Sequence, residues 1–221
     1  MKSSINCQSL FSFNSLFFKN IFHGFEYPWE ILSYLKDIIE RFLKDGIDGY
    51  THLCDGVIVG EDVSIGSGVN IEGPTIIGSG SVLRPGAYIR GSVIIGENCV
   101  IGNSGEVKNS ILMDRAQVPH FNYVGDSILG EGAHLGAGVI CSNLRSDGNN
   151  VSIKSTDWCI DTGLRKLGAI LADRTEIGCG AVLCPGTVVG KNTVIYPLTL
   201  ARGVYPKNSV VKNDGSVLKK S

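Results

Sequence analysis

The fold is decided by residues 59–107, which read VGEDVSIGSGVNIEGPTIIGSGSVLRPGAYIRGSVIIGENCVIGNSGEV. An aliphatic residue returns at every sixth position of this stretch, and the residue four places later is in most cases small. Neither the helical period nor the strand period of two produces a spacing of six, whereas a hexapeptide repeat does. The repeated aliphatic positions are Val59, Ile65, Ile71, Ile77, Leu83, Ile89, Ile95, Ile101 and Val107.

A hexapeptide repeat builds a solenoid from one short strand and one turn per repeat. Three repeats close one coil of a triangular prism, and successive coils lie about 4.8 Å apart, the ordinary spacing of hydrogen-bonded strands. The aliphatic residues then stack along the axis, and the glycines supply the backbone conformations that the turns need. We therefore predict an all-β solenoid of parallel strands.

The composition narrows the possible partners and the compartment. The 221 residues carry a net charge of −1, so no basic excess favours nucleic acid, and no apolar run reaches the roughly 20 residues of a membrane span. The cysteine count is odd and no C-x-x-C pair occurs, which predicts small buried residues in a reducing cytoplasm. The seven cysteines are Cys7, Cys54, Cys99, Cys141, Cys159, Cys179 and Cys184.

The first 24 residues are rich in phenylalanine and superficially resemble a signal peptide. Asn14, Lys19 and Asn20 interrupt the apolar run, and no A-x-A cleavage site follows. The alternative is an aromatic segment that packs on its neighbour in the chain or on another subunit.

That neighbour is a predicted amphipathic helix from Pro28 to Lys44. Proline suits the first helical position, apolar residues recur at helical spacing, and Gly46 can end the helix. We expect this helix to dock beside the first coil and to cap the open end of the solenoid, which otherwise exposes unpaired strand edges.

The repeat then continues with interruptions. Its register slips near Met113, disappears over about residues 142–168 and returns at Leu171. A patternless stretch inside a solenoid is more often a functional loop than filler. We divide the chain into residues 1–54 with the aromatic segment and helix, a β-helix over 55–200 with an extruded loop at 142–168, and a tail over 201–221. The hexads add up to five to six coils.

The chemistry is expected where the repeat is broken, because a stacked solenoid has no deep pocket and needs a loop or a second subunit to form one. His120 stands where a core aliphatic residue is expected, and histidine exchanges protons near neutral pH. The four histidines, His23, His52, His120 and His134, show no ligand spacing, so no metal site is predicted.

The run from His120 to Asn143, HFNYVGDSILGEGAHLGAGVICSN, resembles the acetyltransferase domain of the bifunctional glucosamine-1-phosphate acetyltransferase/UDP-N-acetylglucosamine pyrophosphorylase. NLR at 143–145 and TGLRKLGA at 162–169 are similar to archaeal-type sugar-1-phosphate nucleotidyltransferase/acetyltransferases. The resemblance covers about residues 55–212. It implies a left-handed parallel β-helix that assembles as a homotrimer, with acetyl-CoA bound between adjacent subunits.

The resemblance also implies roles for individual residues. His120 stands where the family has its general base, and Glu106 where an acid orients that histidine. Arg84 and Lys108 match the cations that hold the sugar phosphate, a suitable task for fixed positive charge.

Further positions match contacts to the two substrates. Tyr123 and Asn143 match substrate-contacting positions, and His134 stands where bacterial members have a substrate-contacting asparagine. Ala137 matches a position whose backbone lies along acetyl-CoA, and Cys179 falls where relatives place a small residue near the cofactor.

Some residues depart from the family pattern. Leu144 replaces a tyrosine, and Asn149 and Ser152 stand where archaeal relatives carry lysines, which leaves the base intact and the acceptor sugar open. The glycine-rich phosphate loop of the relatives' nucleotidyltransferase domain does not occur in this sequence, so no pyrophosphorylase activity is expected.

Three functional hypotheses follow. The first is an acetyl-CoA-dependent N-acetyltransferase acting on a small molecule, either an amino-sugar phosphate or a nucleotide-linked amino sugar, with an active site shared between subunits. The alternatives are a non-catalytic sugar-nucleotide sensor or regulatory protein, and an acyltransferase that modifies a hydroxyl group, for which histidine also serves as base.

Overall fold

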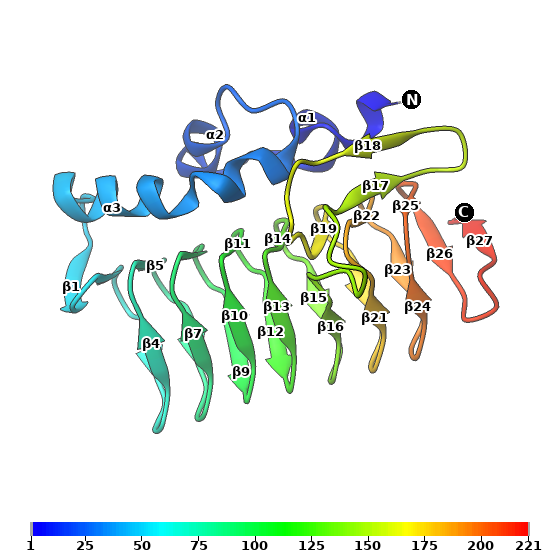
Figure 1. The fold of residues 1–221 in the computed structure, drawn as a ribbon. Helices are drawn as coiled ribbons and strands as arrows, with labels where there is room; N and C mark the ends of the chain where they lie inside the picture. The colour runs from blue at the N-terminus through cyan, green and yellow to red at the C-terminus, as the bar shows by residue number, and fades with distance from the viewer. Residues whose placement is uncertain (1, 221) are drawn as a thin grey trace.

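Three long sheets form the walls of a triangular prism in the computed structural model, which describes residues 2–220 (Figure 1). Each coil contributes one short strand to each wall, and neighbouring strands pair in parallel: Ile77 lies beside Ile95, and Ile95 beside Leu112. In Figure 1 the front strands run upward and the coils advance from left to right, so the winding is left-handed. The predicted fold class is confirmed.

The three walls are named sheets A, B and C, and their strands are given in order along the prism. Sheet A holds β1 (Thr51–Cys54), β2 (Val57–Val59), β5 (Thr75–Ile77), β8 (Val93–Ile95), β11 (Ser110–Leu112), β14 (Ile128–Leu129), β19 (Ala169–Leu171), β22 (Thr187–Val189) and β25 (Val204–Tyr205). Sheet B holds β3 (Ser64–Ile65), β6 (Val82–Leu83), β9 (Val100–Asn103), β12 (Gln117–His120), β15 (His134–Leu135), β20 (Glu176–Ile177), β23 (Val194–Ile195), β26 (Ser209–Val211) and β27 (Val217–Lys219). Sheet C holds β4 (Asn70–Glu72), β7 (Tyr88–Arg90), β10 (Glu106–Lys108), β13 (Tyr123–Gly125), β16 (Ile140–Cys141), β21 (Val182–Leu183) and β24 (Leu200–Ala201).

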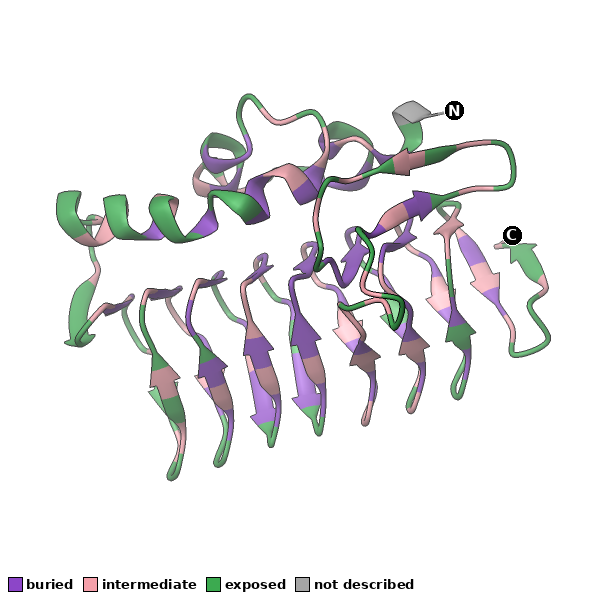
Figure 2. Ribbon diagram, in the orientation of Figure 1, coloured by how far each residue is buried: buried purple, intermediate pink, exposed green. Residues whose placement is uncertain are grey.

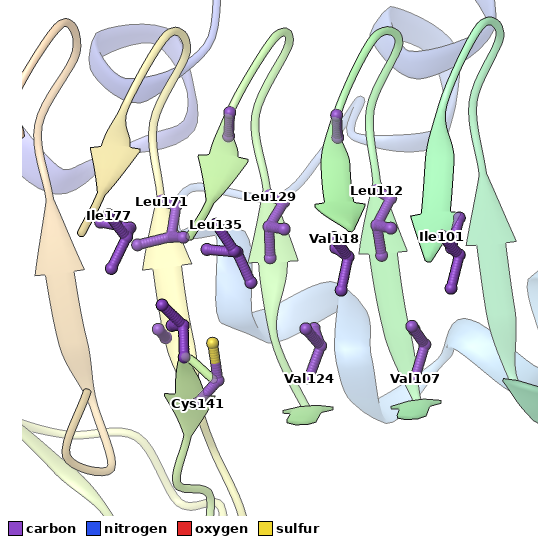
Figure 3. Close-up of a cluster of buried hydrophobic side chains, with 14 of the residues drawn as sticks. Ile101, Val107, Leu112, Val118, Val124, Leu129, Leu135, Cys141, Leu171 and Ile177 are labelled. Carbon is purple, nitrogen blue, oxygen red and sulfur yellow. The ribbon is translucent and has the colours of Figure 1, made fainter. Parts of the chain in front are cut away.

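The interior of the prism is a stack of aliphatic side chains, as the six-residue spacing predicts (Figure 3). Burying such side chains is the main driving force for winding the chain, at about 25 cal/mol per Å² of apolar surface. The two coils that follow Val93 are one residue shorter than the first two, so Leu112 and not Met113 continues the inner column. Buried residues of this stack include Leu83, Ile89, Ile95, Ile101, Val107, Val118, Val124, Leu129, Leu135, Cys141, Leu171, Ile177, Leu183, Val189 and Ile195.

Sheet A also presents an apolar row on its outer face, and the N-terminal segment covers it (Figures 1 and 2). Leu35 and Ile39 of α3 are fully buried in this second core, together with aromatic residues that precede them. The row is Ile58, Ile76, Ile94, Ile111, Ile128, Ile170 and Val188. The covering elements are η1 (Lys2–Ile5), α1 (Cys7–Leu10), α2 (Leu16–Ile21), η2 (Pro28–Ser33) and α3 (Leu35–Asp45).

The predicted helix is placed differently from the expectation. It is interrupted at Tyr34 between η2 and α3, ends at Gly46, and lies along sheet A and not across the end of the prism (Figure 1). The first coil is closed by β1, which pairs antiparallel with β2, and the last by β27, which pairs antiparallel with β26. The apolar row of sheet A explains the difference, because it offers the helix far more surface to bury than the open end does.

The aromatic N-terminus packs on its own chain. Phe11, Phe18 and Phe22 are buried in the second core. The Ser12 hydroxyl donates to Asp173 Oδ2 at 2.8 Å, and Lys191 Nζ lies 3.2 Å from the same oxygen. These contacts join the N-terminal segment to coils that follow the loop.

The stretch at 142–168 leaves the solenoid, as its lack of pattern predicts. It contains an antiparallel hairpin of β17 (Ser152–Lys154) and β18 (Cys159–Asp161), and Leu144 forms a bridge with Lys166 at its base. Val151 and Ile153 are buried in the second core, so the hairpin continues the covering of sheet A.

The predicted number of coils and the predicted tail are wrong. Sheet C alone holds seven parallel strands, and residues 201–220 continue the β-helix with β25 and β26. Coils with polar or shortened hexads still form backbone hydrogen bonds with their neighbours. The spacing of aliphatic side chains does not reveal these coils.

The cysteines are unpaired, and their environments differ. Burial raises the pKa of the Cys99 and Cys141 thiols to about 12, so these two behave as small core residues. Cys54, Cys159 and Cys179 are exposed, contrary to the expectation that they are buried. Within residues 2–220 no helix combines the length and the apolar character needed to cross a bilayer.

Candidate active site

The edge where sheet B turns into sheet C brings three of the sequence-predicted residues into line. Gly138 N donates to His120 O at 3.0 Å, Gly180 N to Ala137 O at 2.8 Å, and Leu198 N to Cys179 O at 2.9 Å. His120, Ala137 and Cys179 therefore occupy equivalent corners of successive coils. His120 and Cys179 are exposed there.

The backbone around His120 is held by a buried side chain. His120 N donates to Asn122 Oδ1 at 2.9 Å, and Asn122 Nδ2 donates to Gly136 O at 2.8 Å in the next coil. Asn122 is 3% exposed, so its amide would be costly to leave unpaired. Asn122 thus fixes the corner from which the imidazole projects. The sequence signal for it was a polar residue four places after Val118, at a hexad position that usually holds a small one.

Glu106 is held by a different partner from the one expected. Its Oε1 lies 2.7 Å from Arg90 Nη1 in the preceding coil of sheet C. No hydrogen bond joins Glu106 to His120 in the part of the chain that the structure describes. Arg90 was not among the predicted site residues, although it lies one strand from Lys108 on the same outer face.

Four polar side chains gather on sheet C and at the base of the loop. Asn143 Nδ2 donates to Tyr123 Oη at 3.1 Å and to Asp126 Oδ2 at 2.5 Å, and Lys108 Nζ lies 3.7 Å from Asp126 Oδ2. Asp126 is 5% exposed and also accepts a hydrogen bond from Asn109. We call Lys108, Tyr123, Asp126 and Asn143 the sheet C cluster.

The sheet C cluster joins three predicted substrate contacts through one residue that the sequence did not single out. Asp126 lies at the corner after β13 with φ of +48°, a conformation that aspartate tolerates better than most residues. Burial raises the pKa of Tyr123, so its hydroxyl stays protonated near neutral pH. The cluster therefore presents a neutral phenol and an ammonium group on sheet C, the wall that begins after the His120 corner.

Arg84 and His134 lie outside this cluster. Arg84 is exposed at the same edge two coils before His120. His134 stands on the outer face of sheet B, and its Nδ1 lies 2.8 Å from Glu176 Oε2. Within one subunit the structure thus divides the predicted residues between two walls. Among residues 2–220 no group of three potential ligands is arranged to hold a metal ion.

The chain is similar in sequence to known proteins. A family model described as the GMPPB C-terminal domain matches residues 71–162. A bifunctional sugar-1-phosphate nucleotidylyltransferase/acetyltransferase of Sulfurisphaera tokodaii is 36% identical over 174 residues, which make up 77% of this chain and 43% of that protein. The chain is a homologue of the C-terminal part of these bifunctional proteins.

A second bifunctional protein shows the same similarity. The bifunctional protein GlmU of Methanococcus vannielii is 35% identical over 198 residues, 87% of this chain and 47% of GlmU. The chain thus spans less than half the length of either bifunctional protein. Among solved structures, the UDP-N-acetylglucosamine acyltransferase from Campylobacter jejuni matches with a TM-score of 0.49 and 17% identity, over 75% of this chain and 71% of that chain. The resemblance stated from the sequence is confirmed by its bifunctional relatives.

Proposed function

We propose that the chain is an acetyl-CoA-dependent N-acetyltransferase that acts on an amino-sugar phosphate, with His120 as general base. The observation that carries this proposal is the exposed imidazole at the edge between sheets B and C, in line with Ala137 and Cys179 and beside the sheet C cluster. The names of the bifunctional relatives, which include an acetyltransferase, support the reaction class.

The residues along the edge suit an extended thioester ligand. Ala137 and Cys179 have small side chains, and Gly138 and Gly180 follow them, so the edge is lined largely by backbone. Acetyl-CoA, when bound, supplies an acetyl group activated as a thioester. Neutral His120 accepts a proton from the acceptor amine as the nitrogen forms its bond to the acetyl carbon. The resulting imidazolium then returns that proton to the departing sulfur, so no net charge is left on the protein.

The cations of sheet C hold the acceptor phosphate in this proposal. Arg90 and Lys108 lie on one face, and a phosphate dianion binds a guanidinium group in a bidentate manner. Such a phosphate competes with Glu106 for Arg90. The Glu106 carboxylate is then free to turn to His120 and to orient it, as the family resemblance implies.

Arg90→Gln is expected to raise the KM for the sugar phosphate by about tenfold, because one charge-assisted contact is lost. The KM for acetyl-CoA should stay the same. Arg115→Gln is the matched control, since Arg115 is also paired with a glutamate, Glu131, but belongs to another edge of the prism. Equal effects of the two substitutions would contradict the assignment of Arg90.

We also propose that the active site is shared between subunits of a homotrimer. Arg84 lies two coils before His120 and His134 lies on the outer face of sheet B, whereas the sheet C cluster lies on the next wall, and a second copy would bring both sets to one acceptor. Light scattering at the monomer mass of 23.6 kDa would contradict this arrangement.

The proposed function is tested with the purified protein, acetyl-CoA and a panel of acceptors, with release of free thiol as the readout. We expect turnover with glucosamine 1-phosphate or galactosamine 1-phosphate and none with the corresponding N-acetylated sugar phosphates. Turnover only with hydroxyl acceptors would favour an O-acetyltransferase. Absence of both turnover and acetyl-CoA binding at millimolar concentration would favour the non-catalytic alternative.

A further inference from the structure

A groove of about 490 Å³ lies on the C-terminal side of the loop, where sheet C turns into sheet A. Ser142, residues 144–147, Ser152 and Lys154 of the loop form one wall, and the corners at Cys184–Gly186 and Arg202–Gly203 form the other. None of the predicted catalytic or substrate-binding residues lines this groove. It is therefore a second candidate site, separate from the edge that carries His120.

The groove is built by close packing of β17 on two glycine corners. A Cβ at Gly186 would meet Val151 Cγ1 at 2.8 Å, and a Cβ at Gly203 would meet Lys154 O at 2.9 Å. Both glycines also have positive φ, +77° and +92°, which side chains rarely adopt. Any larger residue at either corner would push the hairpin off the coils, so the shape of the groove depends on these two positions.

The lining of the groove is positively charged. Three cations face one carboxylate: Asp147 pairs with Arg145, whose Nε lies 3.0 Å from Asp147 Oδ1, while Lys154 and Arg202 form no ion pair with any residue in the described range 2–220. Two unneutralised cations that line the same groove favour a dianion such as a phosphate group.

The size of the groove and the apolar part of its lining indicate a ligand larger than inorganic phosphate. A volume of about 490 Å³ falls within the range of sites for small organic ligands, roughly 300 to 1,000 Å³. Leu144, which is 45% exposed, and Pro185 add apolar surface beside the cations. A nucleoside can lie against such a surface while its phosphates reach Lys154 and Arg202.

We infer that this groove binds a phosphorylated nucleoside. The inference concerns a groove that none of the predicted catalytic residues lines. Its acyl-donor source rests on the proposed function, whereas its nucleotide-sugar source goes beyond that function. Two sources share the chemistry: the 3′-phosphoadenosine end of acetyl-CoA, and a nucleotide sugar that binds as a regulator.

The test is calorimetric titration of the intact chain with adenosine 3′,5′-bisphosphate, UDP, adenosine and inorganic phosphate. At least one of the two nucleotides should bind. The double variant Lys154→Gln/Arg202→Gln should lower the affinity for that nucleotide by about tenfold or more, since two charge-assisted contacts are lost. Added salt should weaken binding as well. The matched control is Arg41→Gln/Lys44→Gln on α3. It removes the same two positive charges from a helix that does not line the groove, so the affinity should stay unchanged.

The pattern of losses identifies the source. Weakened binding of adenosine 3′,5′-bisphosphate, with a raised KM for acetyl-CoA at unchanged kcat, assigns the groove to the acyl donor. Weakened binding of UDP, with an unchanged KM for acetyl-CoA, assigns it to a nucleotide sugar. Failure of both nucleotides to bind at millimolar concentration, equal affinity in the two double variants, or binding of inorganic phosphate alone would overturn the inference. Because the titration needs no turnover, it tests nucleotide binding by the groove independently of the proposed acetyl transfer, and only the assignment of the source uses KM values.

Discussion

Replacing His120 by alanine is expected to lower kcat for acetyl transfer by about 10²-fold to 10⁴-fold, the usual contribution of a positioned general base. The imidazole lies exposed on the corner, and its backbone is held by Asn122, so truncation removes the proton acceptor without opening a cavity. The KM values for both substrates should change little, because no binding contact is assigned to this ring. Steady-state assays of thiol release measure both quantities.

The control for His120→Ala is His52→Ala, since His52 is also an exposed strand residue and lies on β1 at the far end of the prism. It should retain wild-type kcat, and both variants should unfold at the wild-type urea concentration. The limb of the pH–rate profile that reports the essential base should disappear only in His120→Ala. Full activity of that variant would refute the assignment of the base.

Substituting Gly102 by alanine is expected to give the largest loss of stability, about 2 to 4 kcal/mol. Gly102 lies on β9 beneath the next coil, and a Cβ there would overlap the backbone carbonyl of Pro119. Backbone cannot move aside as a flexible side chain can, so β12 must shift. Since Pro119 precedes His120, the shift displaces the base, and a misplacement of about 1 Å costs roughly 10²-fold in rate.

Urea unfolding and thiol-release assays of Gly102→Ala measure the two effects. Gly105→Ala in the same coil is the matched control, because its Cβ would approach no atom more closely than 3.3 Å. We expect a much smaller loss of stability there and nearly unchanged kcat. Similar behaviour of the two variants would show that the packing of Gly102 against Pro119 does not position His120.

The interior of the prism was predictable because it is a local, periodic property. Each inward residue, such as Leu83 or Ile101, sits at a fixed separation from the next, so the spacing alone specifies which side chains stack. The outer row of sheet A has a signal of the same kind, since Ile58, Ile76 and Ile94 are three hexads apart. That longer period would have predicted a covered wall and therefore a helix lying along it.

The partners of the site residues were less predictable. The resemblance suggested Glu106 as the partner of His120. The strand register places Glu106 opposite Tyr88, and its carboxylate pairs diagonally with Arg90 on the same neighbouring strand. Asp126 was overlooked because a single aspartate at a turn is common. Only the fold shows that it is buried under Lys108 and Asn143.

The sequence by itself determined the hexapeptide solenoid, the position of its interruption, and the residues that carry the family resemblance, because all three are patterns along the chain. The tertiary structure decided which wall the N-terminal helices cover, which charges pair on sheet C, and where the loop leaves a cationic groove. These features join residues many positions apart, such as Asp126 with Asn143, Ser12 with Asp173, and Lys154 with Gly203. Contacts of this kind depend on coil length and strand register, which accumulate over the whole prism and are not encoded in any one hexad.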